Sequence, residues 1–301
     1  MPLTDVPKVE PTVTQFNVEC GTCPKCGRRV QGRHPEQISD ALGAAANQIG
    51  PNAIALAIEL NKSMGVSDGK IAKFFGDTYD LSVHRSTLRR AFLRAARKAE
   101  PLYERINIIV RDSGLVYPDE TGWKVAGLKE WLWAFVSADA TLYAIEPSRG
   151  FDVVESVLGA DYDGLLGRDG WAPYNRLESA EHQLLLQDSL ALRDLRNEGG
   201  ISRRTFLSRK ADLGWRLDDL ITKDFSNNEN RKLAWHIIDH REHIFTFLEH
   251  PELEATNWPA EQAIRPAVVN RKMSGGNRSR DGARSQAILT SVLRRSESSA
   301  R

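Results

Sequence analysis

Residues 115–146, LVYPDETGWKVAGLKEWLWAFVSADATLYAIE, carry the pattern that decides the fold of this chain. Leu115–Tyr117, Trp131–Ser137 and Thr141–Glu146 are short runs rich in aromatic and β-branched residues, which predicts three strands. A tight Ala-Asp-Ala turn joins the last two. Residues 150–158 then predict a helix, and Gly164–Arg168 a further strand. The order strand, strand, strand, helix, strand predicts an α/β fold with a mixed sheet.

The sequence before this sheet predicts a helical region. Small apolar residues over 38–60 indicate two helices broken at Gly50-Pro51. Ser67 is expected to cap a short helix, Asp68–Phe75, which is followed by a turn through residues 76–78.

A second, arginine-rich helix is predicted to begin between Ser82 and Ser86. Two helices joined by such a turn are typical of a helix-turn-helix DNA reader. An ordinary helical hairpin with a solvated basic face fits the same pattern. The candidate DNA contacts on this helix are Arg85, Arg89, Arg90 and Arg94.

The sequence after the sheet predicts a mainly helical segment over 175–251. A last helix begins at Pro259 or Ala260, and Pro266 is expected to end or kink it. The tail 296–301 predicts disorder. We therefore expect three parts, which are an N-terminal element (1–36), a helical DNA-binding region (37–110) and a catalytic domain (111–301) with a helical insertion at about 176–250.

Composition points to a soluble protein that meets a polyanion. The chain has 301 residues, 41% of them hydrophobic and 27% charged, and no apolar run approaches the roughly 20 residues of a membrane span. No secretory signal is visible, so we expect a cytoplasmic location. The net charge of +1 conceals two basic blocks, with eight Lys/Arg against two acids over 84–111 and nine against two over 262–301. Such blocks favour contact with nucleic acid.

Three acidic residues, each in an unusual setting, are the candidate catalytic groups. Asp119 and Asp169 each follow a short apolar run, where a strand would deliver them to a sheet edge, and Glu261 lies where the last helix starts. Carboxylates are the natural ligands of Mg²⁺ or Mn²⁺, and a pair of such ions suits phosphodiester chemistry. Each acid also has a plainer explanation as a turn former or a first-turn helix acid. Glu120 is a rival to Asp119, because neighbouring strand residues point to opposite faces.

All three cysteines, Cys20, Cys23 and Cys26, fall within seven residues, which favours a metal site over a disulfide scaffold. Cys23-Pro-Lys-Cys26-Gly has the spacing of a zinc knuckle. Cys20 and His34 are the nearby candidates for the two further ligands that a closed zinc site requires. The alternative is half a site whose partner pair is missing.

Several of these motifs, in this order, resemble the bacterial transposases of the insertion-sequence-66 family. The resemblance runs from about Phe16 to Val292. Its most specific stretches are Gly-Arg-His-Pro-Glu-Gln-Ile-Ser-Asp-Ala-Leu-Gly (32–43), Asp-Glu-Thr-Gly-Trp (119–123), Trp-Leu-Trp (131–133), Ser-Arg-Gly (148–150), Asp-Gly-Trp (169–171), Ala-Glu-Gln-Ala-Ile-Arg-Pro (260–266) and Arg271-Lys272.

This resemblance implies a DDE-type, ribonuclease-H-like core in which Asp119, Asp169 and Glu261 hold two magnesium ions. It implies a zinc-binding N-terminal element, helix-turn-helix DNA contact, and DNA cleavage and strand transfer at the ends of an insertion sequence. Terminal repeats and target DNA are the expected partners, with assembly of copies on DNA, accessory proteins of the element and a place at the nucleoid. Further candidate DNA contacts are Arg149, Arg265, Arg271 and Lys272.

The chain departs from the family pattern at two places. Leu185 and Asp188 stand where the family usually carries a Cys-x-x-His pair, and Asn257-Trp258 stands where it carries paired asparagines. A catalytically inactive DNA-binding copy and a nuclease that only hydrolyses therefore remain alternative functions.

Overall fold

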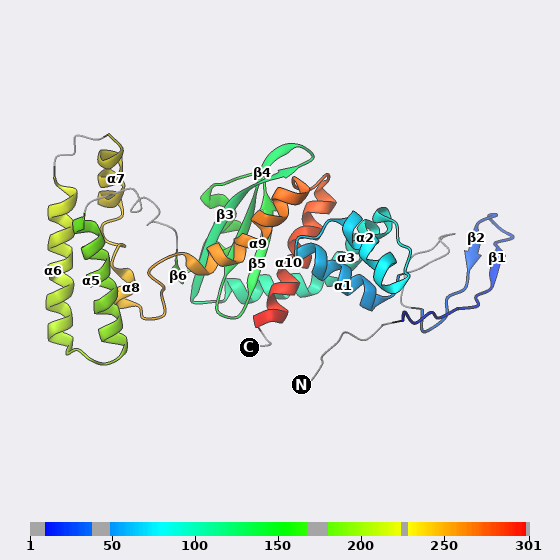
Figure 1. Ribbon diagram of the computed structural model, residues 1–301, viewed down its shortest axis with the longest axis horizontal. Helices are drawn as coiled ribbons and strands as arrows, with labels where there is room; N and C mark the ends of the chain where they lie inside the picture. The colour runs from blue at the N-terminus through cyan, green and yellow to red at the C-terminus, as the bar shows by residue number, and fades with distance from the viewer. Residues whose placement is uncertain (1–9, 38–48, 168–179, 224–227, 299–301) are drawn as a thin grey trace, which may run out of the picture.

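The computed structural model describes residues 10–37, 49–167, 180–223 and 228–298. The described elements lie along one axis, as Figure 1 shows. A small hairpin of β1 (Cys20–Thr22) and β2 (Arg29–Gln31) lies at one end. The N-terminal helices and a four-stranded sheet follow, and a separate group of helices occupies the other end.

The central sheet confirms the predicted mixed α/β class. β3 (Leu115–Val125), β4 (Leu128–Val136) and β5 (Thr141–Glu146) form an antiparallel meander. Helix α4 (Phe151–Leu158) then leads to the short β6 (Leu165–Leu166), which pairs parallel to β3. The strand order is β5-β4-β3-β6. Ala126 and Gly127 turn β3 into β4 with φ of 52° and 84°, the left-handed pair that a two-residue hairpin requires.

The first strand is much longer than the predicted Leu115–Tyr117, so Asp119 lies in mid-strand and the prediction of a strand end was wrong. Pro118 is tolerated there for a geometric reason. Gly114 and Val116 direct their carbonyls toward β6, where Leu165 and Gly167 donate to them. The main-chain groups of Pro118 therefore also point to the β6 side of β3, beyond the residue at which β6 ends. Because an N–H at this position would point away from β4, its absence removes no hydrogen bond between β3 and β4.

The two faces of the sheet have different cores. Trp123 and Val125 of β3 pack with Leu132 of β4 against α9 (Trp258–Ser274). Strand alternation places Asp119 on this same face. The opposite face, which includes Val116 and Trp133, packs against the N-terminal helices and α4.

The N-terminal helices are α1 (Pro51–Lys62), α2 (Asp68–Tyr79) and α3 (Arg85–Arg111). The start of α1 confirms the break at Gly50-Pro51, and Ser67 Oγ caps α2 as predicted by accepting from the Lys70 N–H. The preceding predicted helix lies largely outside the described residues.

The turn of this helical region differs from the sequence prediction, and its last helix contains an internal proline. The turn lies at residues 80–84 rather than 76–78, because α2 runs on to Tyr79 and ends with Asp80 in the left-handed conformation, at φ 50°. Helix α3 also continues through Pro101 to Arg111. Pro101 is exposed, whereas Tyr103, Ile106 and Val110 beyond it are buried against the sheet. That burial offsets the lost helical hydrogen bond.

The predicted helical segment is a lobe of α5 (Ala180–Asn197), α6 (Arg203–Ile221), α7 (Asn228–Asp239) and α8 (Thr246–Glu249). It has an apolar core of its own, in which Leu217 and Leu248 are fully buried. The chain leaves the sheet after β6 and returns through α9, so the lobe is an insertion within the sheet domain. No helix in the described part of the chain is both long and apolar enough to span a bilayer.

Pro266 was predicted to end or kink the last helix. It does not end α9, which continues to Ser274, and a kink stays a prediction. The Gln262 carbonyl would ordinarily accept the N–H of residue 266. It accepts instead from the Arg294 guanidinium of α10 (Arg280–Ser298), at 3.2 Å. The long-range donor thus satisfies the acceptor that proline leaves free.

The C-terminal helix α10 was not predicted, and it includes residues 296–298 of the supposed disordered tail. The loop between α9 and α10 is held by contacts of Asn277. Asn277 accepts from the Trp123 indole N–H at 2.7 Å, donates to the Gly282 carbonyl at 3.1 Å and forms a bridge to Val125. This loop is therefore an extension of the sheet core.

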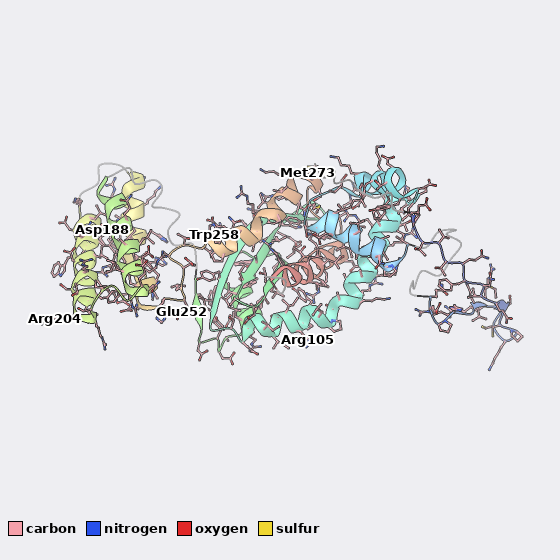
Figure 2. All side chains as sticks on the ribbon, turned by 60° about the horizontal axis from the view of Figure 1, so that its bottom comes forward. Arg105, Asp188, Arg204, Glu252, Trp258 and Met273 are labelled. Carbon is pink, nitrogen blue, oxygen red and sulfur yellow. The ribbon has the colours of Figure 1, made fainter. Side chains whose placement is uncertain are left out.

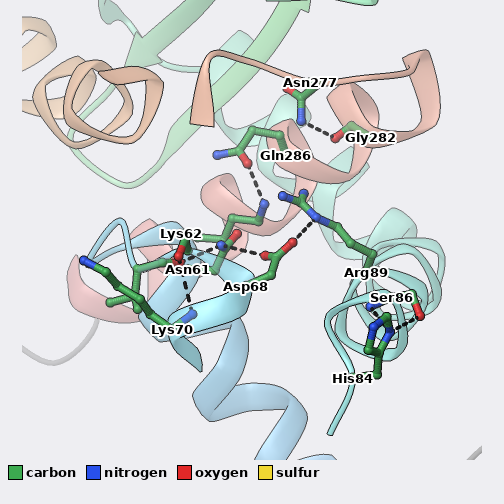
Figure 3. A network of polar contacts seen from close by, with 12 residues as sticks. Asn61, Lys62, Asp68, Lys70, His84, Ser86, Arg89, Asn277, Gly282 and Gln286 are labelled. Carbon is green, nitrogen blue, oxygen red and sulfur yellow. Dashed lines mark hydrogen bonds and ion pairs between the residues drawn. The ribbon is translucent and has the colours of Figure 1, made fainter. Parts of the chain in front are cut away.

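A buried lysine joins the N-terminal helices to α10. Figure 3 shows Lys62 at the end of α1 pointing to Gln286, whose Oε1 accepts from Nζ at 2.5 Å. Asp68 and Arg89 form an ion pair beside it. Burial, and then the charge of Arg89, lower the pKa of Lys62 from its usual 10.5 to about 7, against a smaller opposing effect of Asp68.

This burial predicts a pH-dependent stability. Because the folded pKa lies below the unfolded one, the unfolded chain binds more protons between pH 7 and 10.5, and stability rises with pH across that window. We expect the free energy of unfolding to gain up to about 1.4 kcal/mol per pH unit in urea melts from about pH 7.5 to about pH 9. Lys62→Met should lack this slope. Parallel curves for the two proteins would contradict the assignment.

Candidate active site

The structure separates the two rival acids of β3. Asp119 is half-buried on the α9 face, and its Oδ1 accepts from the Glu120 N–H at 2.8 Å. Glu120 is directed to the other face, where its Oε1 binds Arg149 Nε at 2.6 Å. Arg149 also lies over the Trp131 ring, 4.9 Å from its centroid. Glu120 is thus committed to an ion pair, and this geometry favours Asp119 as the acid that faces α9.

Glu261 lies in the first turn of α9 and is exposed to solvent. The start of this helix is tied to β3, since Asn257 Nδ2 donates to the Pro118 carbonyl at 3.2 Å and the Glu261 N–H donates to the Asn257 carbonyl at 3.0 Å. Glu261 is therefore one helical turn from Asn257, and Asn257 contacts Pro118, the residue before Asp119.

The far end of α9 is fixed to the same strand. The Arg271 guanidinium donates to Thr121 Oγ1 at 3.2 Å and to the Gly122 carbonyl. Figure 2 shows Trp258 and Met273 at opposite ends of α9, with Trp258 nearer the helical lobe. The helix is thus held against β3 at both ends, and its first turn is fixed relative to Asp119.

Asp169, the third predicted acid, lies outside the described residues. The described chain approaches it through Gly167, whose N–H donates to the Val116 carbonyl at 3.0 Å. Among the described residues, no three His, Cys, Asp or Glu side chains gather so as to hold a metal ion. Convergence of Asp119, Asp169 and Glu261 stays a prediction.

The donor set around Asp119 nevertheless suits a divalent cation. The carboxylates of Asp119 and Glu261 are of the kind that would supply the oxygen ligands that Mg²⁺ and Mn²⁺ prefer. Asn257 is buried, at 4% exposure, and its Oδ1 has no hydrogen-bond partner among the residues that the structure describes. A buried acceptor of this kind calls for a donor such as a bound water, or for a cation. Sequence reasoning noted Asn257 only as half of a family motif, and nothing local marked its contact with Pro118.

The candidate zinc ligands are only partly brought together. Cys23 and Cys26 interact within the turn between β1 and β2, and N–H groups of Cys26 and then Lys25, followed by the Cys26 thiol, lower the pKa of Cys23. His34 instead packs against Phe16, with ring centroids 5.0 Å apart. Cys20 is exposed at the start of β1. In residues 10–37 no third ligand joins the Cys23–Cys26 pair.

The predicted DNA-binding cations fall into two groups. Arg89, Arg149 and Arg271 bind Asp68, Glu120 and β3 within the chain, so they have structural partners. The others are exposed or half-buried cations on α3 and α9, which are Arg85, Arg90, Arg94, Arg265 and Lys272.

The family departures in the lobe are accommodated structurally. Leu185 is buried in the core of the lobe, at 5% exposure. Asp188 forms an ion pair with Arg216 at 2.7 Å. Among the described residues, no contact places Leu185 or Asp188 beside Asp119 or α9.

Comparison with known families gives the class of protein. A family model described as "Transposase IS66 family" matches residues 47–187 and 209–285, so the chain is a transposase-class, DNA-processing protein. The chain belongs to the IS66 family of transposases. Among curated proteins, none matches it significantly.

The two neighbouring cations at the end of α9 should behave differently when removed. Arg271→Ala leaves the Gly122 carbonyl without its donor and should lower the free energy of unfolding by about 1–3 kcal/mol in urea melts. Lys272→Ala, on the exposed side, should change stability by less than about 0.5 kcal/mol. Equal stability of the two variants would contradict the anchoring role of Arg271.

Proposed function

We propose that this protein cuts DNA at insertion-sequence ends and joins the resulting 3′ hydroxyls to target DNA, with Asp119, Asp169 and Glu261 holding a pair of Mg²⁺ or Mn²⁺ ions. The observation that carries the proposal is the tie between Asn257 and Pro118, at 3.2 Å, which sets the first turn of α9 against the strand of Asp119. Family membership supports the transposition function.

The sheet topology supports a ribonuclease-H-like core. An antiparallel meander of β3, β4 and β5 is followed by a helix and by β6, which returns parallel to β3. This order brings the end of β6 beside the strand that carries Asp119. Gly167 is held at Val116, and two further residues span at most about 7 Å to Asp169. The chain connection is therefore short enough for Asp169 to share a site with Asp119.

The chemistry divides between the ions and the protein. Divalent ions held by Asp119, Asp169 and Glu261 would supply activation of the attacking water or hydroxyl and stabilisation of the leaving 3′ oxygen. Cleavage forms a bond from the attacking oxygen to phosphorus and breaks the bond to the 3′ oxygen, and joining repeats the exchange with the new 3′ hydroxyl as nucleophile. The protein holds its carboxylates in place through β3 and through the two anchored ends of α9.

Removal of one carboxylate tests this assignment against a matched neighbour. Asp119→Asn should reduce magnesium-dependent strand cleavage by about 100-fold or more, because each ion contributes several kcal/mol of charge stabilisation. Glu120→Gln alters the adjacent acid on the opposite face and should retain cleavage within about threefold, because Glu120 binds Arg149 on the face away from α9. Cleavage would be followed on a labelled terminal-repeat duplex. Full activity of Asp119→Asn would refute the proposal.

DNA binding is proposed for the exposed cations of α3. Arg90 is exposed, whereas Arg89 one position earlier is paired with Asp68. Arg90→Ala should weaken duplex binding and reduce the slope of log affinity against log salt by about 1. Arg89→Ala is the matched control, and we expect a smaller change in that slope. Identical slopes for wild type and Arg90→Ala would remove α3 from the DNA interface.

A DNA-binding protein without catalysis is the second candidate function, because Leu185 and Asp188 stand at the family's Cys-x-x-His positions and serve the lobe core and an ion pair. Duplex binding with neither cleavage nor joining by the wild-type chain supports it. Cleavage without a joined product supports the hydrolytic nuclease instead.

Zinc binding by the N-terminal hairpin is also proposed. The Cys23–Cys26 turn, with Gly27 at φ 67°, supplies two thiolate ligands at knuckle spacing. Cys20 and His34 would complete the site only by moving toward that pair.

A further inference from the structure

One buried oxygen beside the proposed metal site has no hydrogen-bond partner in the described chain. Asn257 Oδ1 is inaccessible to solvent, although the other end of the same amide is bound to the Pro118 carbonyl. This contact fixes the orientation of the amide, because the reverse orientation would place two carbonyl oxygens against each other. The unpartnered atom is therefore an acceptor.

Gln37 Oε1 and Asn107 Oδ1 are the other buried side-chain acceptors without a partner among the described residues, and neither belongs to α9 or its first turn. Asn277, by contrast, has partners for both ends of its amide. Asn277 accepts from the Trp123 indole and donates to the Gly282 carbonyl. Asn270, in α9 itself, donates to the Lys62 carbonyl at 2.8 Å. Leaving a buried carbonyl unsatisfied costs about 1–3 kcal/mol, so an asparagine is a poor choice at position 257 unless a further group donates to it.

The position of Asn257 indicates what that group is. Its Nδ2 lies on the carbonyl that precedes Asp119, and its main-chain carbonyl accepts from the N–H of Glu261. The residue therefore joins the strand of Asp119 to the first turn of α9, which carries Glu261. Mg²⁺ releases its water reluctantly and usually keeps several bound waters, each of which carries hydrogens to donate. A neutral buried acceptor suits such a water, since it adds no charge to a site that already holds carboxylates.

We propose that Asn257 Oδ1 accepts a hydrogen bond from a water in the hydration shell of the divalent ions, and so acts as a positioning residue for the metal site. This inference rests on the proposed function, because Asp119 and Glu261 must hold the ions. Asn257 then has two roles. Its Nδ2 fixes the position of α9 along β3, and its Oδ1 orients the water. Groups that orient ligands in this way typically contribute 10–100-fold to metal affinity.

Two substitutions at position 257 separate these two roles. Asn257→Leu has similar size and removes both the donor and the acceptor. Asn257→Asp keeps an acceptor but loses the donation to Pro118. Asn270→Leu makes the same chemical change elsewhere in α9, where the amide binds Lys62 rather than the site. Glu261→Gln is the reference for loss of a proposed ligand. Urea melts of all four variants show which of them remain folded.

Metal affinity would be measured without DNA on the full-length chain, by titrating Mn²⁺ and following the free ion by electron paramagnetic resonance. We expect Asn257→Leu to weaken Mn²⁺ binding about 10–100-fold. Asn257→Asp should bind at least as tightly as wild type, and Asn270→Leu should bind within about twofold of it. The concentration of Mg²⁺ that half-saturates cleavage should rise in parallel for Asn257→Leu.

Three results would overturn the inference. Wild-type Mn²⁺ affinity in a folded Asn257→Leu shows that the acceptor has no role. Equal weakening by Asn257→Leu and Asn257→Asp assigns the effect to the Pro118 contact alone. Wild-type affinity in Glu261→Gln refutes the proposed metal site itself and the inference with it. If Glu261→Gln loses Mn²⁺ binding while Asn257→Leu keeps it, the metal site stands and only the role of Asn257 is refuted.

Discussion

The site depends on one packing constraint, which is that α9 must lie across β3 after the chain has passed through the whole helical lobe. Ala263, Ile264 and Ala267 of α9 pack against the sheet face of Trp123 and Val125. Small side chains let the helix approach the sheet closely, so its orientation is set by contact rather than by the connecting chain. Polar contacts at Asn257 and Arg271 then fix its position along the strand. Without this register, Glu261 would have no defined relation to Asp119.

Local patterns were sufficient for much of the fold. The strands β4 and β5, helix α4 and the Ser67 cap of α2 depend on side-chain periodicity and on single capping residues, and all were predicted within a few residues. The start of α9, one or two residues from the predicted Pro259 or Ala260, also follows a local rule, because proline is favoured in the first helical turn. The placement of Glu261 in that turn was therefore predictable, although the strand beneath it was not.

The wrong predictions share a physical cause, which is a partner distant in sequence. Pro266 ends or kinks a helix by local rules, but the Arg294 guanidinium donates to the acceptor that this proline leaves free. The loop around Asn277 has the composition of a flexible segment, yet Trp123 holds it. Asp119 was placed at a strand end because it follows the short apolar run Leu115–Tyr117, whereas the strand continues to Val125 through its pairing with β4.

The lobe and the N-terminal helices extend the sheet domain in opposite directions, so DNA contacts on α3 and the acids beside α9 would be linked through the sheet and α10 (Figure 1). The central claim is that Asp119, Asp169 and Glu261 surround one metal site. Iron(II) bound in place of magnesium cleaves nearby backbone when ascorbate and peroxide are added, and mass spectrometry locates the cuts. If the three residues surround one site, the cuts lie close to all three and excess Mg²⁺ suppresses them. Cuts near only one of them, or cuts that Mg²⁺ does not suppress, would contradict that claim.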